Sequence, residues 1–232
     1  MTSSGSGSEP GVTGSAGGFG ATGAALDVDS VAFDLLTALV DSWSLWERVA
    51  GEVALGRAWR TASLRLVTSA GQYEPYDGMV RRAALEVGVP VERADTLLER
   101  WPEILPWPEA PSVLAALNGL RLAIVTNCSQ RLAEIAAGAT GGVFEVIMSA
   151  ERARVYKTDP RAYQAALDAL GLSPKRVLFV AGSAHDVPGA GAVGMPVYWS
   201  NRQGLTVPPG PPPLANAPNL NGLLPLLGLP IR

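Results

Sequence analysis

Three ionisable side chains in this sequence lie just after or beside apolar runs, where the strands of a parallel sheet would end. Asp34 closes the run 31–33, Asp186 follows the run 177–181, and Lys157 lies in a loop before a predicted helix. Ligands of an open parallel sheet bind beyond the carboxyl ends of its strands, so these side chains are expected to converge. A carboxylate can act as a nucleophile, a nearby ammonium keeps it ionised, and a second carboxylate can direct water.

Other residues that follow the strands are expected at the same edge of the sheet: the polar side chains of Thr126, Asn127, Cys128, Ser183 and His185, with Gly182 among them. A thiol–imidazole dyad of Cys128 and His185 is disfavoured. Nothing in the sequence orients the imidazole, and a lone cysteine is more often a small buried side chain. Asp186 could also cap the helix that follows it, since aspartate is favourable at a helix start. Each residue alone therefore has a plain structural explanation, and only the set indicates a site.

Apolar runs alternate with helical periodicity along the second half of the chain. Strands are predicted at 31–33, 122–125, 144–148, 177–181 and 196–199. Helices are predicted at 129–137, 160–170 and 186–193. Strands that alternate with helices are typical of α/β proteins with a parallel sheet. The expected fold is a Rossmann-like three-layer α/β/α core with an inserted helical cap.

The cap is predicted because helical spacing of apolar residues runs through 43–101, directly after the first strand. Four prolines within 102–111 mark its hinge. The expected organisation is a disordered Gly/Ser-rich leader at 1–26, a core at 27–42 and 109–206, a cap with hinge at 43–108, and a Pro-rich tail at 207–232. The tail is expected to cross the surface in extended form. Its last part would be anchored by Leu223, Leu224, Leu226 and Leu227.

Composition excludes several classes of function. The 232 residues carry 18 Lys+Arg and 21 Asp+Glu without a basic block, which argues against nucleic acid or an anionic membrane surface as a partner. One cysteine excludes an intramolecular disulfide and a zinc site built from several thiolates, and one histidine excludes any metal centre that needs two imidazoles. No apolar run reaches the roughly 18 residues of a membrane helix, and no signal peptide is visible. A cytoplasmic setting is therefore expected.

Four stretches, VAFDLLTALVDS, AIVTNCS, VYKTDPRAY and LFVAGSAHDVPGAGAVGMPVYWSNR, resemble the four ordered motifs of the haloacid dehalogenase superfamily, covering about 31–202. The phosphatase branch carries a second aspartate and a magnesium-binding acid where this sequence has Leu36 and Gly182. The L-2-haloacid dehalogenase branch tolerates an apolar residue at the first place and needs no metal. It also has a Trp-Arg pair in the cap, matched by Trp59-Arg60, and a tyrosine six residues after the motif lysine, matched by Tyr163. The resemblance therefore favours that branch.

The resemblance implies a hydrolase in which Asp34 attacks the carbon that bears the leaving group and forms an aspartyl ester. Arg60 would bind the halide or the substrate carboxylate, Lys157 would pair with Asp34, and Asp186 would guide water with Ser183. Substrate contacts are expected from Thr126, Asn127, Ser183, Tyr163, Leu36 and His185. The implied substrate is a small 2-substituted carboxylic acid, with no metal or other cofactor. Dimers are common in this branch, and the apolar cap could provide the interface.

The sequence departs from the family pattern at three places. Thr37-Ala38 replaces the usual Gly-Thr, although Thr37 could still supply a hydroxyl. Ala181-Gly182-Ser183 replaces a Ser-Ser-Asn run, and His185 replaces the usual aromatic residue. Three alternatives therefore stay open: opening of a strained ring in a small amino acid, a magnesium-dependent phosphatase with an unusual site, and a catalytically silent binding protein. Arg57 and Arg65 compete with Arg60 as ordinary surface arginines of the cap.

Overall fold

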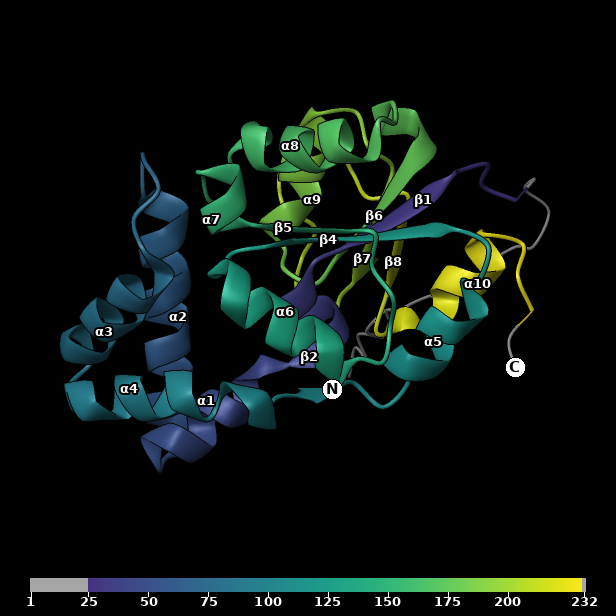
Figure 1. The fold of residues 1–232 in the computed structure, drawn as a ribbon. Helices are drawn as coiled ribbons and strands as arrows, with labels where there is room; N and C mark the ends of the chain where they lie inside the picture. The colour runs from purple at the N-terminus through teal and green to yellow at the C-terminus, as the bar shows by residue number, and fades with distance from the viewer. Residues whose placement is uncertain (1–24, 231–232) are drawn as a thin grey trace, which may run out of the picture.

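A computed structural model describes residues 25–230, so the predicted leader at 1–26 lies almost entirely outside the described residues. Within them, six parallel strands form one sheet in the order β5-β4-β1-β6-β7-β8 (Figure 1). Their bounds are β1 Ser30–Phe33, β4 Arg121–Thr126, β5 Val146–Ser149, β6 Val177–Ala181, β7 Val197–Ser200 and β8 Ala215–Ala217. This arrangement confirms the predicted parallel α/β sheet.

Strand β1 is the centre of the sheet and the point where the strand order reverses. Phe33 is in register with Ile124 of β4 on one side and with Val180 of β6 on the other. Along β1, Val31 and Phe33 enter one hydrophobic layer, whereas Ala32 enters the other, as the two-residue period of a strand requires. The residue after β1 therefore lies at the switch point, where ligands of such sheets bind.

Helices cover both faces of the sheet (Figure 1). One face packs against α8 (Pro160–Leu170) and α9 (Asp186–Ala192). The other packs against α5 (Ala110–Ala116), α6 (Gln130–Ala139) and α10 (Leu223–Leu226). The short helix α7 (Ala150–Ala153) follows β5. Predicted and observed helices agree within two residues at each end; the largest strand difference is β5, which begins at Val146 rather than at residue 144.

The chain leaves the core after β1 through one wide helical turn, η1 (Leu35–Leu39), and the strand β2 (Val40–Asp41). It returns through β3 (Leu105–Pro106), which pairs antiparallel with β2. Between these strands lie α1 (Ser42–Ala50), α2 (Val53–Ser69), α3 (Tyr76–Glu86), α4 (Val91–Glu99) and the short turn η2 (Trp101–Glu103). Figure 1 shows these helices standing beyond the carboxyl ends of β4 and β5. They are the helical cap that the periodicity predicts.

Buried tryptophans hold the cap together. Trp46 of α1 and Trp59 of α2 meet edge to face with ring centroids 4.6 Å apart, an arrangement that favours aromatic attraction. The indole N–H of Trp59 donates to the Val80 carbonyl of α3 at 3.0 Å. Gly56 lets α1 and α2 approach closely, because a Cβ there would lie 2.5 Å from Glu47 Cα. The cap helices are thus tightly packed against one another, and their buried side chains continue the hydrophobic layer of one face of the sheet.

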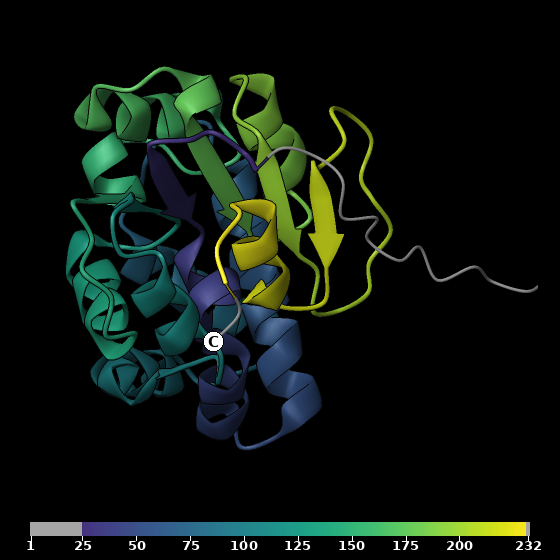
Figure 2. The same cartoon turned by 90° about the vertical axis from the view of Figure 1, so that its right-hand side faces the viewer.

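The C-terminal segment differs from the extended tail expected at 207–232. Ala215–Ala217 form β8, the edge strand beside β7, and α10 follows (Figure 2). The proline run ends at Pro213, so the next residues have free N–H groups, and Leu214 N–H donates to Val197 O at 2.8 Å. Leu223 and Leu224 are buried, as the anchoring role requires, whereas Leu226 and Leu227 are half-buried. None of the helices within 25–230 has the length and apolar character needed to cross a membrane.

Candidate active site

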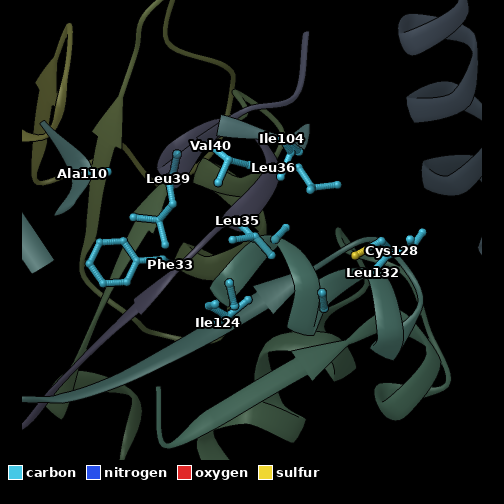
Figure 3. Close-up of a cluster of buried hydrophobic side chains, with 14 of the residues drawn as sticks. Phe33, Leu35, Leu36, Leu39, Val40, Ile104, Ala110, Ile124, Cys128 and Leu132 are labelled. Atoms are coloured by element: carbon cyan, nitrogen blue, oxygen red, sulfur yellow. The ribbon is translucent and has the colours of Figure 1, made fainter. Parts of the chain in front are cut away.

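Asp34 is the first residue after β1 and caps the turn η1. Its Oδ2 atom accepts three hydrogen bonds, from Thr37 N–H at 3.0 Å, Thr37 Oγ1 at 2.6 Å and Ala38 N–H at 3.1 Å. The apolar side of the same turn anchors it in the core, where Leu35 and Leu39 lie with Phe33 (Figure 3). The carboxylate is therefore fixed by a turn that cannot move without disturbing the hydrophobic layer beneath it.

Lys157 joins two carboxylates at the ends of different strands. Its Nζ atom lies 2.8 Å from Asp34 Oδ1 and 3.0 Å from Asp186 Oδ2, and all three side chains are buried. The Asn127 side chain fixes the Lys157 backbone from both sides: it accepts from Lys157 N–H at 2.7 Å and donates to Lys157 O at 2.8 Å. The structure thus brings together the three ionisable residues that the sequence predicts to converge.

Asp186 begins α9 and has a second partner behind it. Tyr163 of α8 donates its hydroxyl proton to Asp186 Oδ1 at 2.8 Å. The Tyr163 ring is fully buried and packs edge-on against Phe179, with ring centroids 5.3 Å apart. Tyr163 therefore orients Asp186 from the side of the sheet.

The surroundings separate the pKa values of the two carboxyl groups. Burial tends to raise the pKa of Asp34, but the charge of Lys157 and the hydrogen bonds from Lys157 and Thr37 outweigh it and lower that pKa. Burial is the largest effect on Asp186 and raises its pKa. The charge of Lys157 lowers this pKa, but the negative charge of Asp34 offsets part of that lowering. Burial opposes the charge of Lys157, but the two carboxylates raise its pKa. Asp34 is thus held ionised, whereas Asp186 is the more basic carboxylate.

Arg60 of α2 supplies a buried cation from the cap side. Its guanidinium carbon lies 5.5 Å from the ring centroids of both Trp43 and Trp46. It donates to Ser42 Oγ at 3.5 Å, and its Nε atom has no hydrogen-bond partner among the described residues. Arg60 forms no ion pair with any carboxylate within residues 25–230. A buried guanidinium without a counter-ion favours binding of an anion.

One cavity of about 850 Å³ connects the core and the cap. Most of the predicted site residues line it, namely Asp34, Leu36, Arg60, Asn127, Lys157, Ser183, His185 and Asp186. Thr126 and Tyr163 do not line it. Thr126 is buried with its hydroxyl 3.8 Å from Cys128 Sγ, so substrate contacts from Thr126 and Tyr163 have no support in this geometry. Cys128 is also buried, and burial raises the pKa of its thiol to about 12, which leaves it inert.

Sequence reasoning did not assign a site role to Trp107 and Arg202, which also line the cavity. The indole N–H of Trp107 donates to Thr37 O at 3.0 Å, and the Arg202 guanidinium carbon lies 4.3 Å from the centroid of the Trp107 ring. Trp107 lies in the proline-rich hinge, and Arg202 lies shortly after the last predicted strand. Their positions in the sequence were therefore a signal that could have identified them as site residues. The hydroxyl of Thr37 was expected as a substitute donor, and the structure places it on Asp34.

Gly182 is required by close contact with the turn that holds Asp34. A Cβ at this position would lie 2.3 Å from Ala38 N and 2.5 Å from Thr37 C, so no side chain fits without moving the turn that holds Asp34. An acidic residue could not replace Gly182 in this backbone. Within residues 25–230, no three His, Cys, Asp or Glu side chains gather closely enough to hold a metal ion.

The comparison with known proteins agrees with this arrangement. The family model described as haloacid dehalogenase-like hydrolase matches residues 22–194, three quarters of the chain. The chain belongs to the haloacid dehalogenase-like hydrolases. Haloacetate dehalogenase H-2 of Moraxella sp. (strain B) is 30% identical over 196 residues, which cover 77% of this chain and 88% of that protein.

Solved structures place this haloacid dehalogenase-like hydrolase in the L-2-haloacid dehalogenase-like branch. One L-2-haloacid dehalogenase superposes with a TM-score of 0.77 at 27% identity, covering 87% of this chain and 99% of the other. The L-2-haloacid dehalogenase of Xanthobacter autotrophicus, solved with chloropropionic acid covalently bound, superposes with a TM-score of 0.76 at 25% identity, covering 87% and 98%.

Proposed function

We propose that this hydrolase cleaves the carbon–halogen bond of small L-2-haloalkanoic acids through an ester on Asp34. The observation that carries this proposal is the buried Asp34–Lys157–Asp186 set, which faces the uncompensated cation Arg60 across one cavity. The Asp34 carboxylate on one wall can attack as a nucleophile, and the Arg60 guanidinium on the opposite wall can stabilise an anionic leaving group. The names of the relatives supply the substrate class and the L configuration.

In the first step, Asp34 Oδ1 is the attacking atom. Oδ2 already accepts three hydrogen bonds, whereas Oδ1 accepts one, from Lys157, and keeps a lone pair for the substrate carbon. The new Oδ1–carbon bond forms as the carbon–halogen bond breaks, and the halide leaves with the bonding electron pair. Because attack and departure occur on opposite sides, the configuration at that carbon inverts.

In the second step, water hydrolyses the ester. Asp186 takes a proton from the water, whose oxygen attacks Asp34 Cγ, and negative charge develops on Oδ2. The N–H groups of Thr37 and Ala38 and the Thr37 hydroxyl already point at Oδ2, so they stabilise this oxyanion. Collapse breaks the Cγ–Oδ1 bond, Asp186 returns its proton to the departing oxygen, and the product is a 2-hydroxy acid that carries Oδ1.

The remaining site residues hold the substrate and the catalytic groups. The side-chain amide of Asn127 makes two hydrogen bonds to the Lys157 backbone and so positions the Lys157 ammonium. Leu36, Ser183 and His185 lie on the cavity wall, where they surround the substrate carboxylate and side chain. A small acid is the partner that the site requires. The magnesium phosphatase alternative is disfavoured, because Leu36 cannot transfer a proton and position 182 has no room for a metal-binding carboxylate.

The direct test is halide release from L- and D-2-chloropropionate in the presence of EDTA. The wild type is expected to release chloride from the L enantiomer, and Asp34→Asn is expected to lose this activity. Asp168→Asn is the matched control, because Asp168 is an exposed aspartate on α8 whose carboxylate accepts only from Gln164. Release that persists in Asp34→Asn, or that stops with EDTA, would contradict the proposal.

A further inference from the structure

The cap contacts the core at a second place, away from its hinge. The loop at 70–75 joins α2, the helix of Arg60, to α3. In Figure 1 this loop lies at the upper end of α2, whereas α1 and β2 lie at its lower end. The hydroxyl of Tyr156 donates to the Glu74 carbonyl of this loop at 2.7 Å. The core therefore holds the cap at this loop as well as through the hinge.

Two contacts of Tyr73 surround this hydrogen bond. The rings of Tyr73 and Tyr156 have centroids 5.5 Å apart, and the Arg154 guanidinium carbon lies 4.8 Å from the centroid of the Tyr73 ring. Next to these contacts, a cavity of about 290 Å³ lies between the loop and the core. Residues 71–73 line it from the loop, and Arg154 and Arg161 line it from the core. Part of the loop is thus separated from the core, and the Tyr156 hydrogen bond is one of the contacts that hold it.

Tyr156 and Lys157 are neighbours in the sequence, and their side chains reach different partners. Tyr156 extends to the cap loop, whereas the Lys157 ammonium lies between Asp34 and Asp186. Asn127 holds the Lys157 backbone on the core by two hydrogen bonds. The core segment that carries Lys157 therefore also fixes one point of the cap relative to the two carboxylates.

The Tyr156 hydroxyl stays a donor over the working range of pH. Tyr156 is 3% exposed, and burial raises the pKa of its hydroxyl, so the proton remains on the oxygen. The Glu74 carbonyl has no proton to give, so the direction of the hydrogen bond is fixed.

The loop belongs to the part of the cap that faces Asp34. Arg60 lines the large cavity from α2, and α2 packs against α3. A displacement of the loop at 70–75 would therefore displace the helices that set the distance between Arg60 and Asp34. We propose that Tyr156 is a positioning residue: its hydrogen bond to Glu74 holds the cap helices at the spacing from the core that places Arg60 opposite Asp34. This inference rests on the proposed function, in which both residues act on one substrate.

The first test asks whether the hydrogen bond holds the cap loop, and it needs no substrate. Hydrogen–deuterium exchange of peptides that cover 70–79 is expected to be about threefold to tenfold faster in Tyr156→Phe than in the wild type, the range that loss of one hydrogen bond gives. Tyr73→Phe is the matched control, because it removes a hydroxyl from the same contact and keeps both rings and the Tyr156 hydroxyl; it should exchange like the wild type. Equal exchange in the wild type and Tyr156→Phe would overturn the proposal whatever the activity.

The second test asks whether Tyr156 acts through Arg60. In Tyr156→Phe, kcat/KM for L-2-chloropropionate should fall about threefold to tenfold. The same substitution in an Arg60→Lys background should cost less than twofold, because a wall that has lost its guanidinium gains little from the correct spacing. An equal loss in both backgrounds would show that the two residues act independently, and would overturn the positioning role.

The pH profile separates this role from a disturbance of the core. Asn127 and Tyr163 hold Lys157 and Asp186 without help from Tyr156, so the acidic limb of kcat should not move in Tyr156→Phe. A limb that moves would mean that Tyr156 acts on Lys157, and would overturn its assignment to the cap.

Failure of the proposed function has a different signature. If the wild type releases no halide from any haloacid, but exchange of 70–79 rises in Tyr156→Phe and not in Tyr73→Phe, the proposed function fails and the Tyr156 link to the cap stands.

Discussion

Tyr163 donates its hydroxyl proton to Asp186 Oδ1 at 2.8 Å from within the core, while Lys157 holds the other oxygen of the same carboxylate at 3.0 Å. Both oxygens of the Asp186 carboxylate are thus hydrogen-bonded by residues of the protein itself. Its position is fixed by residues that come from α8 and from the loop before it. The orientation of Asp186, the base in the proposed mechanism, is therefore set by the packed core and does not depend on the cap.

This contact predicts a change in the pH profile of Tyr163→Phe. Burial raises the pKa of Asp186, and the Tyr163 hydrogen bond lowers it in part, so removal of the hydroxyl should raise that pKa further. Because Asp186 must be ionised to accept a proton from water, the acidic limb of kcat is expected to move to higher pH. Tyr198→Phe is the control, since that buried hydroxyl donates to Asn219 O at 2.6 Å, away from the site. An unmoved limb in Tyr163→Phe would contradict the role of Asp186 as base.

Removal of the Lys157 charge should destabilise the fold in a pH-dependent way. Lys157→Met leaves two buried carboxylates without a counter-ion, and the free energy of unfolding at pH 7 is expected to fall by about 3–5 kcal/mol. In the wild type the lowered pKa of Asp34 contributes stability above its unfolded value of 3.8, and that contribution is lost as the pH falls through the folded value.

In Lys157→Met the pH dependence should reverse, because acid neutralises the two carboxylates that the lysine no longer compensates. The difference in the free energy of unfolding between wild type and Lys157→Met, measured by urea unfolding, should therefore be smaller at pH 5 than at pH 7. The exposed Lys175→Met should show no deficit at either pH. A deficit that stays constant with pH would indicate lost packing and would refute the electrostatic explanation.

Gly182→Ala tests the close contact with the turn that holds Asp34. The added Cβ would meet Ala38 N at 2.3 Å and Thr37 Oγ1 at 2.5 Å, so the turn that holds Asp34 must shift. A shift of this size is expected to lower kcat about a hundredfold. Gly138→Ala on α6, where an added Cβ meets nothing within 4 Å, should keep full activity and gain about 0.5–1 kcal/mol of stability. Equal activities of the two variants would show that the turn tolerates the shift.

A contact between the hinge and the C-terminal segment predicts a local effect on stability. Glu109 pairs with Arg202 at 2.5 Å and accepts from Leu220 N–H at 3.2 Å, and Arg202 stacks on Trp107. Glu109→Gln is expected to cost about 1 kcal/mol and to speed proteolysis within the segment that carries β8 and α10. Glu103→Gln, which breaks an exposed pair with Arg100, should leave the proteolysis rate unchanged.

The sheet and the meeting of Asp34, Lys157 and Asp186 could be predicted from the sequence for one physical reason. The runs 31–33, 122–125 and 177–181 are continuous, polar side chains follow each of them within two residues, and parallel strands place such ends at one edge. The helical cap could be predicted because its apolar residues, Trp43, Trp46 and Val49 among them, recur at helical spacing.

The rest depends on contacts between segments that are distant in the sequence. Tyr163 was expected beside the substrate, yet its helix turns the ring behind Asp186. Tyr156 reaches the cap only because the loop at 70–75 lies against the core, and no local pattern encodes that contact. Strand β8 is three residues long and follows a proline run, which is too short a signal for a periodicity argument.

The central claim is that Asp34 transfers its own oxygen to the substrate, and a single turnover in H₂¹⁸O measures this most directly. With enzyme in excess over L-2-chloropropionate, the lactate formed is expected to carry ¹⁶O at its new hydroxyl, and the peptide that contains Asp34 should gain one ¹⁸O by mass spectrometry. Lactate labelled with ¹⁸O and an unlabelled Asp34 peptide would mean that water attacks the substrate carbon directly, and would contradict the aspartyl-ester mechanism.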